Sequence, residues 1–342
     1  MTPASDRRAL RAAATGSAGG PVAWLAPVLL LAGFAGLPVW ADKGLVFLAG
    51  MVMTQIVFAL SFNLMFGLTG LVSFGQAALF AAGAYGAAWL ARTAPGLPFG
   101  LVVLFGGAVG AVLSVLVGAV ALRRASGIYF AILTLALGQL VFVVIGKTTA
   151  LGREDGLVGI RRPVLDLGVL RLDLARGDAY YWLLLIACAV LVALLWWVWH
   201  GSLGRLLAAI RQDPERVRFL GVNVRRHREL AFVISGTATA IAGAIMAPWS
   251  QIITPMLAHW SYSALPILFC LLGGASRFWG PAVGAIVFAW LEHATRNMFG
   301  MAELLVGGAL LVVVLAMPGG ILGSLVRLRP ARPAPVTGKD RP

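Results

Sequence analysis

The residue types that carry out covalent chemistry are few in this sequence, and they are not grouped. Four histidines lie at scattered positions without metal-ligand or catalytic-triad spacing, and we interpret each as an interfacial histidine: His200, His227, His259 and His293. None of the three lysines completes a G-x-x-x-x-G-K-[ST] phosphate-binding loop: Lys43, Lys147 and Lys339. The sequence therefore predicts no catalytic residue, metal site or cofactor in this chain, and it disfavours an enzyme.

Uncharged polar side chains gather instead in residues 63–85, NLMFGLTGLVSFGQAALFAAGAY, where glycines interrupt an apolar run. Irregular backbone at membrane depth is tolerated only against protein or a water-filled cavity, and interrupted helices often hold solutes. One interpretation is a solute pathway that includes Asn63, Ser73 and Gln76. The other is an ordinary turn with small residues for helix packing, and the sequence does not choose between them.

Two further apolar segments carry polar residues. Tyr129 and Thr134 lie in residues 126–139, SGIYFAILTLALGQ, and serve either interhelical hydrogen bonds or solute contact. Glu292 lies within another apolar run, where a carboxylate is costly and indicates function by default. Arg296 follows four positions later, however, so an intrahelical ion pair is an equal interpretation.

The composition indicates a chain whose main solvent is lipid. Hydrophobic residues make up 60% of the 342 positions and charged residues 12%, whereas soluble domains have about 25% charged residues. The formal charge of +14 does not indicate nucleic acid, because the basic residues lie between long apolar segments and suit lipid headgroups and topology signals. Cys188 and Cys270 both lie in apolar segments and are interpreted as small buried residues.

A helix needs about 20 apolar residues to cross a bilayer, and ten runs approach that length. They are residues 22–40, 45–66, 76–91, 99–122, 126–146, 180–199, 229–250, 261–276, 281–297 and 303–322. An even number of spans with the N-terminus inside places most Lys and Arg residues in cytoplasmic segments. The predicted fold is an all-α polytopic transmembrane helix bundle of about ten spans, with both termini cytoplasmic.

The segments outside these runs divide the chain further. Residues 1–20 are predicted to be a cytoplasmic N-terminal segment before a retained first helix, residues 21–323 the transmembrane domain, and residues 324–342 a disordered basic tail. The loop at 147–179 is predicted to lie outside and contains VLDLGVLRLDL, an alternating pattern typical of a short hairpin.

The cytoplasmic loop at 200–228 contains GSLGRLLAAIRQDPERVRFLGVNVRRHR. Its apolar residues are spaced to form one stripe: Leu206, Leu207, Ile210, Val217 and Leu220. Pro214 divides the loop into two short helices, and Gly221 ends the second. An amphipathic helix pair with a basic face either docks into a groove on a partner or lies on anionic lipid.

At this loop the sequence resembles the permeases of branched-chain amino acid ABC transporters, in particular their LivM-like subunit. The resemblance is carried by GRLLAAIRQDPER at 204–216, Gly-Val-Asn at 221–223 and AFVISG at 231–236. It extends to the stretches 63–76 and 126–137, to LLGG at 271–274, WGP at 279–281 and MPGG at 317–320, in order over residues 45–323.

The resemblance implies a subunit of an ABC importer in the bacterial inner membrane. Its expected partners are a second, LivH-like permease, two ATPase subunits that bind the ATP, and a periplasmic substrate-binding protein that uses the 147–179 loop. It also implies that the 200–228 loop is the coupling segment, with these residues as ATPase contacts: Gly204, Arg205, Ala209, Arg211, Glu215 and Gly221.

Branched-chain amino acids are the substrate that the resemblance implies first. Two departures from the family pattern, at Leu151–Leu157 and Ser263–Leu265, leave urea, short amides and aromatic carboxylates open as alternatives. The rival hypothesis from another class is a self-sufficient secondary transporter with Glu292 as its coupling carboxylate.

Overall fold

The computed structural model describes residues 22–124, 127–160, 162, 164–166, 171–173, 177–295, 302–317 and 319–327. The chain divides into two compact units, Met1–Ala49 and Gly50–Pro342. The first unit contains α2 (Val22–Trp40) and the beginning of α3 (Lys43–Thr69). All the other elements, and every residue of the candidate site, belong to the second unit.

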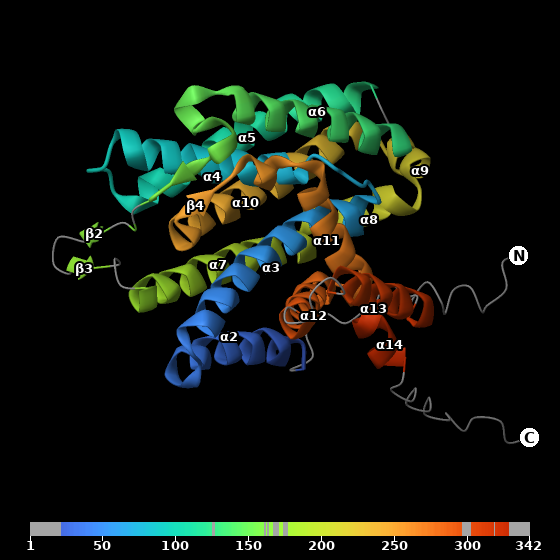
Figure 1. Cartoon of the computed structure of the whole chain (residues 1–342). Coiled ribbons are helices and arrows are strands. Elements are labelled where there is room, and N and C mark those ends of the chain that lie inside the picture. Colours follow the sequence, from blue (N-terminus) through green and yellow to red (C-terminus); the bar gives the residue numbers. More distant parts are fainter. Residues whose placement is uncertain are drawn as a thin grey trace, which may run out of the picture. The chain divides into compact units, whose positions relative to one another are not determined.

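Helices form most of the regular structure, as predicted. In the second unit, the apolar helices after α3 are α4 (Gln76–Thr93), α5 (Phe99–Arg124), α6 (Ile128–Lys147), α7 (Gly177–His200), α10 (Val224–Ser250), α11 (Trp260–Gly273), α12 (Gly280–Thr295) and α13 (Ala302–Ala316). Two short helices, α8 (Ser202–Gln212) and α9 (Pro214–Phe219), follow α7 and precede α10 along the chain (Figure 1). The all-α fold is therefore confirmed.

Five of the described helices are long and apolar enough to cross a membrane: α3, α5, α6, α7 and α10. Residues Leu29–Trp40 and Trp260–Gly273 form shorter apolar helices. The count of ten spans and the side on which the termini lie both stay predictions.

The run at 303–322 is not one helix, so this part of the prediction is wrong. Helix α13 ends at Ala316, and a separate helix, α14 (Gly320–Arg327), follows it. Gly320, the first residue of α14, has φ +71°, a left-handed conformation that glycine adopts readily and that interrupts a continuous right-handed helix. Helix α14 also continues four residues beyond 323, and the rest of the predicted tail lies outside the described residues, as do residues 1–20.

The core of the second unit forms where α10 packs against α4 and α5 (Figure 1). The most apolar windows of α3 and α10 are 72% buried, whereas those of α5, α6 and α7 are only 22–28% buried. Because all five helices are similarly apolar, the three exposed ones present faces suited to lipid or to another membrane subunit.

Glycines allow this close packing. A Cβ on Gly83 of α4 would overlap the backbone carbonyl oxygen of Ala240 in α10, and a Cβ on Gly243 of α10 would overlap that of Phe80 in α4. Small residues at such crossings let helix backbones approach closely enough for extensive van der Waals contact.

Four short strands form two separate antiparallel pairs. β2 (Val164–Asp166) pairs with β3 (Arg171–Asp173), with Leu165 opposite Leu172, so the predicted hairpin is confirmed. β1 (Leu157–Val158) pairs with β4 (Ile252–Ile253), which follows α10. Three 3₁₀ turns, at Thr149–Leu151, Arg153–Asp155 and Pro255–Ala258, flank this second pair.

Candidate functional site

The interrupted helix predicted around residues 63–85 is present as a break between α3 and α4. Gly70 ends α3 with φ +74°, and its N–H donates to the carbonyl oxygen of Phe66 at 3.1 Å. Residues 70–75 are neither helix nor strand, yet Leu71, Ser73 and Gly75 are buried. The break is therefore an irregular segment held inside protein rather than a solvated turn.

Side chains bind the N–H groups that this irregular segment leaves without helical partners. The hydroxyl of Thr134 in α6 accepts from the N–H of Phe74 at 3.2 Å, and that of Ser73 accepts from Gly75 at 3.3 Å. The hydroxyl of Ser263 in α11 accepts from the N–H of Ala77 at 2.9 Å. The predicted polar residues Ser73 and Thr134 thus act together on the same few backbone groups.

Gln76 begins α4 and joins it to α10 and α3. Its Nε2 donates to the hydroxyl oxygens of Ser235 at 2.8 Å and Thr239 at 2.9 Å, which are four residues apart on one face of α10. The hydroxyls of Thr239 and Ser61 lie 2.6 Å apart, and Ser235 donates to the carbonyl oxygen of Ser61 at 2.6 Å. All four side chains are at most 1% exposed.

We call Ser61, Gln76, Ser235 and Thr239 the buried polar network. Of these four residues, only Gln76 was predicted from the sequence as a site residue. The signal for the α10 pair was present, because Ser235 and Thr239 are spaced i, i+4 in an apolar helix and so share one face. Only the tertiary structure shows that this face meets Gln76.

Asn63 lies in α3 and contacts a different part of the chain. Its Nδ2 donates to the carbonyl oxygen of Arg277 at 3.3 Å, and its Oδ1 lies 3.8 Å from the thiol of Cys270. A Cβ on nearby Gly67 would come within 2.7 Å of the carbonyl oxygen of Ala275. The end of α3 therefore packs closely on the turn between α11 and α12.

The two other predicted pathway residues lie apart from these groups. Tyr129 is 71% exposed on α6, and Glu292 is exposed on α12. Arg296, the suggested partner of Glu292, lies outside the described residues. A groove of about 470 Å³ on α5 and α6 is lined by other residues: Ala119, Val120, Arg123 and Leu133. A role in solute passage stays a prediction for all six pathway residues.

A second set of contacts lies at the other end of α4 and α10. The β1–β4 pair buries Leu157 opposite Ile253 and exposes Val158 opposite Ile252. The N–H groups of Gly159 and Ile160 both donate to the carbonyl oxygen of Gln251, at 3.0 and 3.2 Å. The loop predicted to lie outside is thus fixed at its beginning to the end of α10.

The loop at residues 200–228, which is predicted to be cytoplasmic, folds as two helices, as predicted. Asp213 caps α9, because its Oδ1 accepts from the N–H of Arg216 at 3.0 Å and Pro214 takes the first helical position. Gly221 follows α9 with φ +84°. Helix α10 begins in the same way, with Asn223 Oδ1 accepting from the N–H of Arg226 at 3.1 Å.

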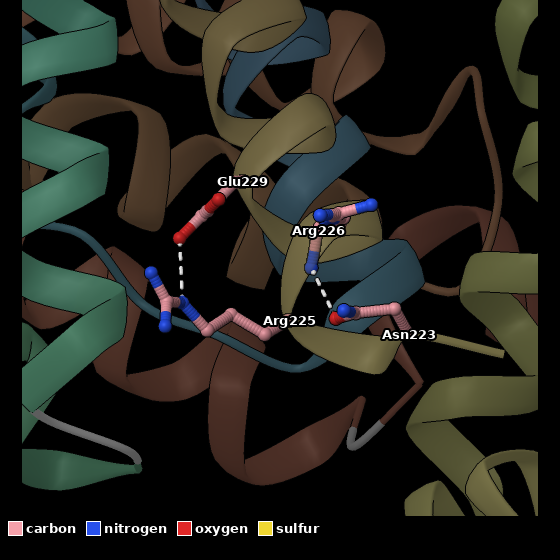
Figure 2. Close-up of polar contacts among 4 residues, drawn as sticks. All are labelled: Asn223, Arg225, Arg226 and Glu229. Carbon is pink, nitrogen blue, oxygen red and sulfur yellow. Dashed lines mark hydrogen bonds and ion pairs between the residues drawn. The ribbon is translucent and has the colours of Figure 1, made fainter.

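The first turns of α10 also contain an ion pair. Arg225 Nε lies 2.7 Å from Glu229 Oε1, one helical turn further along. Figure 2 shows this pair and the Asn223 cap on neighbouring turns. Both partners are partly exposed, so such an i, i+4 pair stabilises the helix by only about 0.5 kcal/mol.

The predicted apolar stripe of the loop is correct for its first part and wrong at its end. Leu207 and Ile210 are fully buried, and Val217 is 6% exposed. Leu220, by contrast, is 78% exposed, and its neighbour Phe219 is 91% exposed. Since α9 ends at Phe219, Leu220 has left the helix whose periodicity the stripe assumed.

The six residues implied as ATPase contacts fall into two groups. Four are buried or engaged within the chain. Gly204 is buried, and a Cβ there would overlap the carbonyl oxygen of Trp199. Ala209 is half-buried, Arg205 donates to the carbonyl oxygen of His200 at 2.8 Å, and Arg211 donates to that of Gly67.

Arg205 and Arg211 are nevertheless exposed, as are the other two residues, Glu215 and Gly221. We define the α9 face as a surface of exposed residues in which two large apolar side chains lie among charged ones: Glu215, Arg216, Arg218, Phe219 and Leu220. Gly221 follows this surface in the chain. Sequence reasoning placed Leu220 in the buried stripe and did not single out Phe219.

Within the described residues, no group of three or more His, Cys, Asp or Glu side chains is placed to hold a metal ion. What the site contains instead is a buried polar network beside a broken helix, and an exposed basic and apolar helix in a loop. With its apolar helices of membrane-spanning length, the chain is a multi-pass membrane protein.

Residues 44–315 match the family model of the permease component of branched-chain amino acid transport systems, and the chain belongs to this family. It is therefore a permease subunit of the ABC transporter class.

Individual relatives agree with this assignment. The permease protein LivM of the high-affinity branched-chain amino acid transport system of Escherichia coli K12 is 28% identical over 306 residues, covering 83% of this chain and 71% of that protein. LivH of Salmonella typhimurium, from the system of the same name, is 24% identical over 43% of this chain and 47% of its own length. The L-arabinose permease AraH of Escherichia coli K12 is 31% identical over 38% of this chain and 41% of its own length. No solved structure matches this chain significantly.

Proposed function

We propose that this chain is the LivM-like permease of an importer for branched-chain amino acids in the bacterial inner membrane. It pairs with a LivH-like permease, two ATPase subunits bind the ATP and dock on the cytoplasmic loop, and a periplasmic binding protein delivers solute near the 147–179 loop. The observation that carries the proposal is the family match over residues 44–315.

The α9 face supports the docking of ATPase subunits. Phe219 and Leu220 are 91% and 78% exposed. The basic residues Arg216 and Arg218 beside them are also exposed. Aromatic and Arg residues are enriched where protein partners bind tightly, and a short helix that presents such residues suits a groove on a partner. Glu215 adds a charge of opposite sign, which helps to fix the register of a partner.

The proposed branched-chain substrate rests on the LivM and LivH relatives, which are permeases of branched-chain amino acid transport systems. The AraH relative belongs to an L-arabinose transport system, so relatives of this chain transport more than one kind of solute.

Affinity capture of the tagged chain from gently solubilised native membranes tests the assembly. We expect two ATPase subunits and a second permease to be recovered with it. The variant Phe219→Ser should reduce ATPase recovery about tenfold or more, because removing an aromatic anchor costs about 2 kcal/mol or more of binding.

The matched control is Leu97→Ser, which removes a partly exposed apolar side chain from the α4–α5 connection. It should leave ATPase recovery at the wild-type level. Recovery of the wild-type chain alone would contradict the proposal and favour a self-sufficient carrier.

Uptake into vesicles that contain the captured complex, its binding protein and ATP tests the substrate. Labelled leucine, isoleucine and valine should be taken up, and unlabelled urea, short amides, aromatic carboxylates and L-arabinose should not compete. Uptake of one of these compounds in labelled form, with no uptake of the three amino acids, would reassign the substrate while leaving the transporter class intact.

A further inference from the structure

Arg211, in the last turn of α8, reaches the end of another helix. Its Nη1 donates a hydrogen bond to the carbonyl oxygen of Gly67 in α3. Its Cγ, Nε and Cδ atoms lie 3.5, 3.6 and 3.8 Å from the position that a Cβ on Gly70 would occupy. The side chain therefore lies along the last turn of α3 and over the glycine at which that helix ends.

Electrostatics explains why a guanidinium group suits this place. The last carbonyl groups of a helix lack intrahelical donors. In a continuing helix the N–H of Leu71 would donate to the carbonyl oxygen of Gly67, but here it donates to the Thr69 hydroxyl at 3.3 Å. A cation at a helix C-terminus also interacts favourably with the helix dipole. Arg211 thus supplies both a donor and a positive charge where α3 needs them.

The segment that follows leads directly to the buried polar network. Residues 70–75 connect the capped end of α3 to Gln76, and Thr134 and Ser73 bind backbone N–H groups within this short connection. A continuous set of contacts therefore runs from α8, through Arg211 and the broken helix, to Gln76 and its partners on α10.

We propose that Arg211 is a positioning residue that ties α8 to the broken helix, so that a displacement of α8 moves the 70–75 segment and Gln76. This inference rests on the proposed function, in which ATPase subunits displace the cytoplasmic loop. It differs from the role that the sequence resemblance implied, an ATPase contact, because it is argued from the hydrogen bond that the guanidinium group donates to a carbonyl of its own chain.

The test compares Arg211→Met, Arg211→Lys and the control Arg92→Met, which removes an exposed arginine from the last turn of α4. Each complex is captured, its ATPase content is measured, and it is reconstituted with binding protein and ATP. Uptake Vmax, uptake KM and ATP hydrolysis are then measured together, because a purely structural role would not change the amount of ATP hydrolysed per solute transported.

We expect Arg211→Met to retain its ATPase subunits and its ATP hydrolysis while Vmax falls about tenfold or more, within the usual range of coupling between sites. KM should not change, Arg211→Lys should be intermediate because it keeps the charge, and Arg92→Met should match the wild type. If Arg211→Met does not accumulate, Arg211→Gln, which keeps an uncharged donor, replaces it in the comparison.

A wild-type Vmax and a wild-type ratio of ATP to solute in Arg211→Met would overturn the inference. Loss of the ATPase subunits from Arg211→Met alone would also overturn the inference, since Arg211 would then be an ATPase contact. The proposed function would stand in that case. Failure of the wild-type chain to capture ATPase subunits would instead overturn the proposed function.

Discussion

Gly83 lies where α4 crosses α10, and its replacement by alanine tests the packing of the core. The added Cβ would overlap the backbone carbonyl oxygen of Ala240, an atom that no side-chain rotation can move away. Gly146, in α6, is the matched control, because no atom lies within 4 Å of the position its Cβ would take. Both substitutions add one methyl group to a helical glycine.

The magnitude follows from two opposing effects. Replacing glycine by alanine inside a helix stabilises it by about 1 kcal/mol when nothing else changes. Overpacking of a well-packed core costs about 1–3 kcal/mol, and the upper end applies to Gly83 because the overlap is with backbone. We therefore expect Gly83→Ala to lower the free energy of unfolding by about 2 kcal/mol, and Gly146→Ala to raise it slightly.

The assay is reversible unfolding of the purified chain in a mild detergent, titrated with a denaturing detergent and followed by circular dichroism. Gly243→Ala repeats the test from the other side of the contact, since its Cβ would overlap the carbonyl oxygen of Phe80. If Gly83→Ala proves as stable as Gly146→Ala, then α4 and α10 do not approach as closely as described, and the reasoning is refuted.

Two further predictions concern the network and the topology. Gln76→Leu removes two buried hydrogen bonds, which in membrane proteins contribute about 0.6–2 kcal/mol each. The free energy of unfolding should fall by about 1–4 kcal/mol in the same detergent titration, and an unchanged value would show that the amide does not stabilise the bundle. A reporter domain fused after Ala150 should be active outside the cytoplasm, and cytoplasmic activity would contradict the predicted orientation.

The parts of the fold that the sequence predicted are those set by local chemistry. Proline favours the first turn of a helix, and Pro214 takes that position in α9, so the boundary between α8 and α9 was visible in the chain itself. The alternating residues of 164–173 pair across a few positions, and the hairpin formed as predicted. Apolar run length also marked the five described helices that are long and apolar enough to cross a membrane, because a bilayer core requires about 20 apolar residues whatever the neighbours of the helix are.

Predictions failed where local periodicity ended. The stripe of the cytoplasmic loop assumed that one helix phase continued to Leu220, but α9 stops one residue earlier and the side chain is 78% exposed. The run at 303–322 was predicted as a single span because most of its residues are apolar, although Gly320 takes a left-handed conformation that divides it.

The sequence by itself determined that this chain is a helical, multi-pass membrane protein with a broken helix and an amphipathic loop, because the bilayer and the backbone impose those patterns locally. Only the tertiary structure decided which polar groups meet. Ser61 and Thr239 are 178 positions apart, and Arg211 and Gly67 are 144 apart. Contacts across such separations depend on how helices cross, and a periodicity along one helix shows which face is polar but not which helix that face will meet.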